Sequence, residues 1–158
     1  MIPKIIHQIY FDLGIGNIEN NKVFFESHNK FKSLKDYKYI LWNKKDCENL
    51  VKSDFNEYFD FYNNFRFEIQ KIDFIRFCIL YKYGGIYVDL DFLPLKNFDD
   101  LLVSDIIFHN IRYIKPNYSY IENDFMASKP NLTFWKKLIK YCYTEYNDKK
   151  NIKIYDIW

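Results

Sequence analysis

Residues 70–94 read QKIDFIRFCILYKYGGIYVDLDFLP and carry the strongest structural signal in the chain. Apolar residues cover nearly every side of a helix drawn over 67–83, which predicts a helix buried in the centre of a domain. Gly84 and Gly85 follow it, and glycine adopts the left-handed conformation that ends a helix at little cost. Residues 86–90 then predict a short strand. The stretch therefore predicts a helix, a tight turn and a strand in direct succession.

Outward from this stretch, predicted strands and helices alternate along the chain. Strands are expected over 4–10 (KIIHQIY), 37–42 (YKYILW), 105–109 and 124–127. Helices are expected over 22–34, from Asn43, from a cap at Asp54 to residue 63, and over 131–146. This alternation favours an α/β domain with a mostly parallel central sheet. The length of 158 residues corresponds to a single domain, 1–158.

The composition is that of a folded protein without a polyanion-binding surface. Hydrophobic residues make up 49% of the chain and aromatic residues 22%, which is enough to build a core and excludes a disordered chain. The formal net charge is only +2 and basic residues do not cluster, so no nucleic-acid partner is expected. No apolar run approaches the length of a membrane span, so no membrane segment is expected in this chain.

The cysteines indicate a reducing compartment. Cys47, Cys78 and Cys142 are odd in number, widely spaced and without a CxxC pair, so neither a disulfide framework nor a zinc site is expected. The first residues lack the charged segment and the cleavage site of a secretory signal. A cytoplasmic location is therefore expected.

Asp89 and Asp91 are the first candidates for chemistry. Residues two apart in a strand point to the same face, so both carboxylates are expected together at the carboxyl end of the strand, where ligands bind in open α/β sheets. Like charges this close repel unless a cation lies between them. All-oxygen ligation suits Mg²⁺ or Mn²⁺ with open positions for a diphosphate. The alternative is a solvated strand end that carries two surface aspartates.

Asp73 and Arg76 are the second pair of candidates. They are three residues apart and therefore share one face of the predicted helix. Their pairing fits an internal salt bridge that fixes the helix to the sheet. It fits equally a pair that reaches the substrate pocket, where Asp73 accepts hydrogen bonds from hydroxyls and Arg76 supplies positive charge. Lys71 falls on another face, which is expected to be solvated.

Residues 70–94 together resemble the DXD region of glycosyltransferase family 32. This family includes yeast-type initiating mannosyltransferases, capsular polysaccharide enzymes and, more distantly, clostridial glucosylating toxins. The shared features are Lys-x-Asp, the arginine three residues on, the YGGIY turn and the DXD itself. The opening IPKIIHQIY, the strand ending Leu41-Trp42 and the segment NDFMAS at 123–128 are also similar to the family, so the resemblance covers 2–135.

The resemblance implies a GT-A-like (Rossmann-like) nucleotide-sugar-binding fold. It further implies a retaining glycosyltransferase that moves a hexose from a UDP- or GDP-sugar to a glycan or protein acceptor, with Mn²⁺ or Mg²⁺ as cofactor. A catalytically degenerate module that binds a nucleotide sugar or a partner protein is the alternative.

The resemblance also implies residue roles. Asp91 would bind the metal directly, and Asp89 would contact the ribose, the sugar or, through water, the metal. Asp73 and Arg76 would hold the hydroxyls of the donor sugar, and Tyr10 would stack on the base. The other substrate-binding candidates are His7, Gln8, Trp42, Tyr87, Asn123 and Asp124. His7 fits a plain buried strand histidine as well.

Two features point away from a complete member of the family. The family usually continues with a Gly-Pro segment and a late histidine that completes the metal shell, whereas this chain ends at residue 158 and contains only His7, His28 and His109. The chain is therefore expected to be short at its C-terminus, with the remaining metal ligand unassigned.

The stretch 86–93 (IYVDLDFL) also overlaps the nucleophile strand of haloacid dehalogenase-type phosphatases. Against this class, that motif normally opens its domain, and the later lysine and acidic motifs are not evident.

Overall fold

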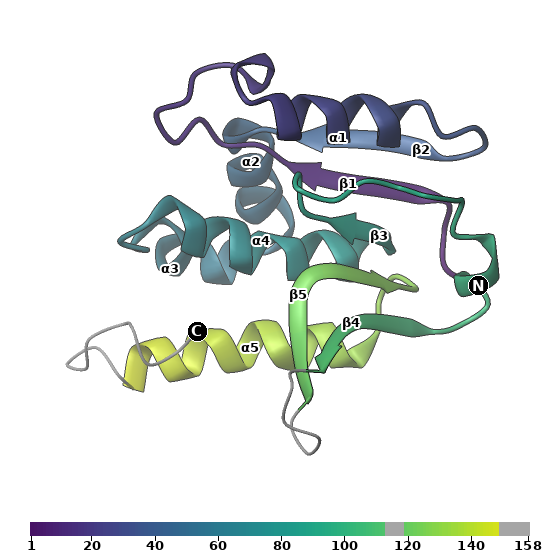
Figure 1. Ribbon diagram of the computed structural model, residues 1–158. Coiled ribbons are helices and arrows are strands. Elements are labelled where there is room, and N and C mark those ends of the chain that lie inside the picture. Colours follow the sequence, from purple (N-terminus) through teal and green to yellow (C-terminus); the bar gives the residue numbers. More distant parts are fainter. Residues whose placement is uncertain (113–118, 149–158) are drawn as a thin grey trace.

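The computed structural model describes residues 1–112 and 119–148 (Figure 1). These residues form a five-stranded mixed sheet with the order β2-β1-β3-β5-β4. The strands are β1 (Ile5–Ile9), β2 (Lys38–Trp42), β3 (Gly85–Val88), β4 (Ile106–Arg112) and β5 (Ser119–Ser128). The α/β class is confirmed, and the extent of the single domain stays a prediction.

The sheet consists of a parallel half and an antiparallel half. β1 pairs in parallel with β2 and with β3, as expected. β5 pairs antiparallel with β3 and with β4, so the mostly parallel arrangement holds only for the first three strands. The reason is the short connection between β4 and β5, because a parallel pair needs a crossover of a dozen or more residues.

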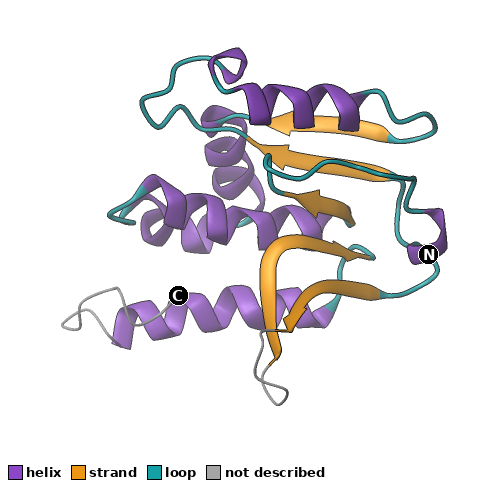
Figure 2. Cartoon of the chain, viewed as in Figure 1, coloured by secondary structure: helices purple, strands orange, loops and turns teal. Residues whose placement is uncertain are grey.

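Helices cover both faces of the sheet (Figure 2). On one face, α1 (Lys22–Lys32) packs through Phe31 on a core that includes Ile6 and Ile86. The other face carries the larger core, formed by α2 (Lys44–Asp54), α3 (Phe59–Asn63), α4 (Glu68–Tyr83) and α5 (Thr133–Asp148). Short 3-10 turns lie at Ile18–Asn20, Asn56–Tyr58 and Asp99–Leu101. α4 is buried along most of its length, as the apolar pattern predicts.

Two expected helix boundaries differ in outcome. The start at Asn43 is confirmed, because its side chain accepts a hydrogen bond of 2.9 Å from the backbone N–H of Asp46. The cap at Asp54 is wrong, because Asp54 is the last residue of α2 and binds Lys82 instead. The following aromatic stretch forms a 3-10 turn before α3 begins at Phe59.

Gly84 and Gly85 join α4 to β3 in conformations that other residues avoid. Their φ angles are +61° and +92°. A Cβ atom on Gly85 would lie 2.5 Å from the carbonyl oxygen of Ile5, because β3 passes very close to β1 here. The predicted turn is confirmed, and the close approach adds a second reason for glycine.

The three cysteines are free and buried. Within the described ranges, no helix is long and apolar enough to cross a membrane. The cytoplasmic location stays a prediction.

Candidate functional site

A cavity of about 170 Å³ opens where β1 and β3 end. Its wall is formed by the loop after β1, the first turns of α4 and the residues that follow β3. The lining includes Tyr10, Arg76, Tyr87, Asp89 and Asp91, together with Ile9, Phe11, Leu13, Ile15, Phe24, Ile69, Ile72 and Leu90. The cavity therefore combines an apolar wall with one cation and two carboxylates.

Asp89 and Asp91 lie in a turn rather than in the strand. β3 ends at Val88, so the expected strand over 86–90 is two residues too long. The carboxylates share the cavity because the turn wraps back on itself, with the Phe92 N–H facing the Asp89 carbonyl at 3.4 Å. Asp89 is partly buried and Asp91 is exposed. The Asp91 carboxylate makes no hydrogen bond or ion pair with another residue of the described ranges.

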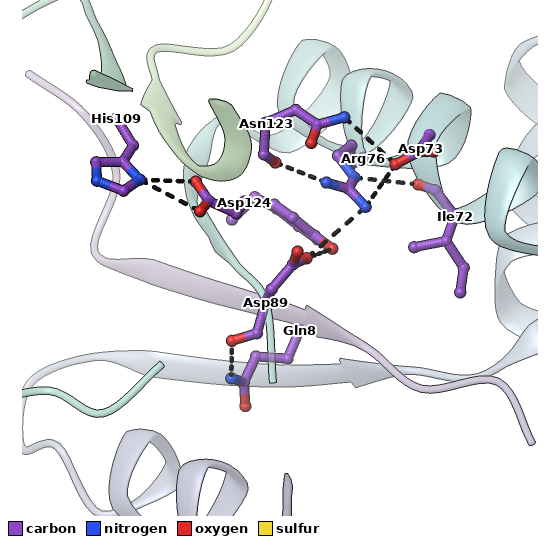
Figure 3. A network of polar contacts seen from close by, with 9 residues as sticks. Gln8, Ile72, Asp73, Arg76, Asp89, His109, Asn123 and Asp124 are labelled. Atoms are coloured by element: carbon purple, nitrogen blue, oxygen red, sulfur yellow. Dashed lines mark hydrogen bonds and ion pairs between the residues drawn. The ribbon is translucent and has the colours of Figure 1, made fainter. Parts of the chain in front are cut away.

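Arg76 is the buried cation of the site, with only 2% of its surface exposed. Its guanidinium forms an ion pair of 2.8 Å with Asp73 and lies 3.7 Å from Asp89. It donates a hydrogen bond of 2.7 Å to the Asn123 carbonyl (Figure 3). It also lies 4.8 Å from the centre of the Tyr87 ring. The structure thus shows the internal salt bridge between Asp73 and Arg76, and of the two residues only Arg76 is among those that line the cavity.

Two acids of this cluster are held in a setting that disfavours their charged form. Burial raises the pKa of Asp73 above its ordinary value, and the Arg76 guanidinium opposes that shift. Burial also raises the pKa of Asp89, where Arg76 and the Tyr87 hydroxyl oppose the shift and Asp91 and Asp124 add to it. The Arg76 guanidinium thus faces the carboxylates of both Asp73 and Asp89.

An irregularity in β5 brings Asn123 and Asp124 to the same cluster. The Asn123 amide donates a hydrogen bond of 3.3 Å to Asp73. The Asp124 carbonyl accepts a hydrogen bond of 2.8 Å from the Asp89 N–H, and its carboxylate contacts the His109 Nδ1 at 2.9 Å. The structure thus brings Asn123 and Asp124 to the candidates on α4 and β3. His109 has no predicted role, because only the strand register reveals its neighbour.

Gln8 supports the turn from behind. It is fully buried, and its amide donates to the Asp89 carbonyl at 3.3 Å and to the Ser27 hydroxyl at 2.9 Å. Its carbonyl oxygen accepts a hydrogen bond of 2.8 Å from Tyr39, which in turn contacts His28. Gln8 therefore orients the backbone of Asp89 and does not line the cavity.

Tyr10 lines the cavity, and its hydroxyl donates a hydrogen bond of 2.6 Å to the Gly16 carbonyl. This bond fixes the ring against the loop after β1. The ring remains placed where stacking on a base is physically possible, and that role stays a prediction.

His7 and Trp42 lie apart from the cavity. His7 is fully buried, donates a hydrogen bond of 3.0 Å to the Gly84 carbonyl and accepts one of 3.1 Å from the Trp42 indole N–H. Burial lowers the pKa of His7 to about 4, so the ring is neutral near pH 7. Trp42 lines a separate hollow with Tyr83 and Asp54. The structure therefore places His7 as the buried strand histidine and gives neither residue a contact with the carboxylate pair.

Lys71 is a further correction. It is not solvated but buried, with an ion pair of 3.2 Å to Glu68. The Lys71 side chain lies next to the aromatic ring of Tyr62, which is packed in the core. The core therefore covers this face of α4, and this explains why Lys71 is buried.

The donor set at the cavity fits a divalent cation with open coordination positions. Tyr87 and Arg76 engage the Oδ1 atom of Asp89, while the carboxylate of Asp91 is exposed. In the part of the chain that the structure describes, no three His, Cys, Asp or Glu side chains converge to hold a metal. Two hard oxygen donors with space beside them suit a cation whose other ligands are water and a diphosphate.

Comparison with known proteins finds a matching family model and related sequences. A family model described as a glycosyltransferase sugar-binding region containing a DXD motif matches residues 21–108. A mannosyl phosphorylinositol ceramide synthase of Saccharomyces cerevisiae is 35% identical over 89% of this chain and 34% of its own length. An uncharacterized glycosyltransferase of Acanthamoeba polyphaga mimivirus is 31% identical over 96% of this chain and 60% of its own length.

The fold also has a solved counterpart. The PaToxG glycosyltransferase superposes with a TM-score of 0.68 at 20% sequence identity, over 96% of this chain and 64% of that structure. The expected GT-A-like fold is confirmed. The chain spans between about a third and two thirds of the length of these three proteins.

Proposed function

Because this chain belongs to the glycosyltransferase family whose sugar-binding region contains a DXD motif, we propose that its cavity binds a nucleotide-diphosphate sugar. The reaction is transfer of a hexose, with retention, from a UDP- or GDP-sugar to a glycan or protein acceptor. One observation carries the proposal: a buried arginine and two carboxylates line a single cavity at the carboxyl ends of parallel strands. The overlap with phosphatases carries no weight beside this family membership.

Asp89 and Asp91 are the residues that would hold Mn²⁺ or Mg²⁺. The cation would supply charge for the diphosphate, whose oxygens become more negative as the bond to the sugar breaks. Asp91 offers its exposed carboxylate to this ion, while Asp89 is held by the Tyr87 hydroxyl and by its own backbone bond to Asp124. The pair therefore combines one fixed oxygen donor with one exposed donor.

In this proposal Arg76, which lines the cavity, and its ion-pair partner Asp73 hold the donor sugar. Arg76 is held in place by Asp73 and by the Asn123 carbonyl, so its charge needs no reorganisation when the leaving group departs. Asp73 retains acceptor capacity for a sugar hydroxyl. Tyr10 covers the base. The name of the yeast relative points to mannosyl transfer onto a phosphorylinositol ceramide, so a nucleotide-activated mannose is the first donor to test.

The test is calorimetric titration of UDP, GDP and their hexose conjugates, with Mn²⁺ or with EDTA. We expect binding that requires the metal and falls by at least about tenfold in Asp91→Asn, since that variant loses a charged ligand. Asp100→Asn is the matched control, because the Asp100 side chain is 87% exposed and is not among the residues that line the cavity.

Three outcomes of these titrations distinguish an active transferase from a catalytically degenerate binding module. Metal-dependent binding followed by turnover supports the transferase. Binding without turnover in the presence of glycan, lipid and protein acceptors favours the degenerate binding module. An intact wild-type fold that binds no nucleotide or nucleotide sugar contradicts both the donor site and the assignment of Asp91.

A further inference from the structure

β5 contains a bulge at the candidate site. Phe108 of β4 pairs with Met126 of β5, but the next residue, His109, pairs with Glu122. Residues 123–125 therefore have no backbone partner in β4, although Phe125 still pairs with Val88 of β3. Such bulges bend a strand and re-aim its side chains, and β5 bends sharply in Figure 1.

Each of the first two bulged residues holds part of the polar cluster. The Asn123 carbonyl accepts from Arg76 at 2.7 Å, and the Asn123 amide donates to Asp73 at 3.3 Å. The Asp124 carbonyl accepts the N–H of Asp89 at 2.8 Å. The bulge thus fixes Asp73, Arg76 and Asp89 relative to one another.

His109 spans the gap that the bulge leaves between β4 and β5. Its Nδ1 lies 2.9 Å and 3.2 Å from the two carboxylate oxygens of Asp124 (Figure 3). Its ring also packs against that of Phe92 in a T-shaped arrangement, with the ring centres 6.0 Å apart, so the imidazole has a second contact from the side of the DXD turn. A side-chain bond therefore replaces the missing backbone pairing.

We propose that His109 is a positioning residue that holds the β5 bulge in its bent conformation. It thereby fixes Asp89, Asp73 and Arg76 for the donor sugar. Its Nδ1–H donates to the Asp124 carboxylate, and the main chain of the same residue holds the Asp89 amide. His109 need not touch the substrate. The effect on sugar binding rests on the proposed function, whereas the effect on the Asp89 backbone does not.

The first experiment measures amide hydrogen exchange residue by residue by NMR, without ligand. Three variants are compared with the wild type: His109→Leu, His109→Asn and Asn110→Leu. Asparagine can place a donor near the position of Nδ1, whereas leucine cannot. Asn110 is the exposed neighbour on the same strand and controls for adding leucine to β4.

We expect the Asp89 amide to exchange about tenfold faster in His109→Leu, because loss of one charge-assisted hydrogen bond frees the bulge. His109→Asn should restore most of the protection, and Asn110→Leu should match the wild type. Equal exchange at Asp89 in all four proteins would overturn the proposal. A uniform rise at every amide would also overturn it, because that indicates global destabilisation only.

The second experiment compares the affinity for a nucleotide sugar with the affinity for the free nucleotide diphosphate. In His109→Leu the affinity for the nucleotide sugar should fall by about tenfold and the affinity for the free diphosphate by less, because the sugar contacts of Asp73 and Arg76 both depend on the bulge whereas the metal ligand Asp91 does not. Equal loss for both ligands would contradict positioning toward the sugar. If the wild type binds no nucleotide sugar, the proposed function fails, and the exchange experiment still decides the role of His109.

Discussion

The two halves of the sheet contribute to one polar cluster by different means. The parallel half supplies Asp89 and Asp91 from residues that follow directly on a helix, a Gly-Gly turn and a strand. The antiparallel half supplies Asn123 and Asp124 from a bulge, together with the side chain of His109. Local sequence determines the first contribution, whereas the second depends on strand register. The two carboxylates that line the cavity thus follow the parallel half, and the residue that holds the Asp89 backbone belongs to the antiparallel half.

Removing Arg76 should have the largest effect, since Arg76 contacts both halves. Arg76→Met leaves the partly buried carboxylates of Asp73 and Asp89 without their cation, so the free energy of unfolding should fall by about 3 kcal/mol. Nucleotide-sugar binding should be lost with it. Urea denaturation and calorimetry measure the two effects. Arg66→Met is the matched control, because Arg66 is exposed and should cost little. Equal stability of the two variants would contradict the proposal that the contacts of Arg76 with both halves of the sheet stabilise the fold.

Gly85→Ala tests the parallel half alone. The new Cβ would lie 2.5 Å from the Ile5 carbonyl oxygen at a φ of +92°, so strain and a clash add together. We expect a loss of about 3 kcal/mol in the free energy of unfolding. Gly14→Ala shares a positive φ of +99° but meets nothing within 4 Å, so it should lose only about 1 kcal/mol. Thermal denaturation of both variants gives the comparison, and similar losses would show that the close approach of β3 to β1 is unimportant.

The smallest effect concerns the pH dependence of stability. The pKa of Asp89 is raised in the folded state by burial, so its ionisation costs stability as pH rises from its unfolded value of 3.8 through the folded one. Asp89→Asn should therefore gain stability relative to the wild type as pH increases over that window. Asp99→Asn should behave in the opposite way, because Lys4 and Tyr37 lower the pKa of Asp99 and its charged form stabilises the fold.

Urea denaturation between pH 3 and pH 7 measures both differences. For each variant, the quantity compared is the change with pH of its stability relative to the wild type. If this change has the same direction in Asp89→Asn and Asp99→Asn, the burial of Asp89 does not raise its pKa as proposed. The expected result also separates stability from function, because Asp89→Asn should weaken donor binding while its stability relative to the wild type rises with pH.

Sequence predicts the parallel half well and the antiparallel half poorly, for a physical reason. Helix 67–83 and the Gly-Gly turn are local features, and the structure has them within one residue. The direction of β5 and its bulge depend on pairing between distant segments, which periodicity does not encode.

The same reason explains the errors at single residues. Asp54 ends a helix because α2 continues past the expected boundary, and Lys71 is buried because aromatic packing covers a face that spacing alone leaves open. Asp73 and Arg76 were recognisable as a pair from their spacing, but their link to Asn123 required the fold.

The bulge also has a consequence for how the chain acquires its binding site. The contacts from Arg76 and Asp73 to Asn123 close loops of 47 and 50 residues, so they form only after a large loss of chain entropy. During synthesis on the ribosome, the acidic turn would emerge well before the strand that aligns it. Recognition of the donor is therefore a property of the finished fold, and newly made chains pass through a stage in which the carboxylates are present but not yet arranged.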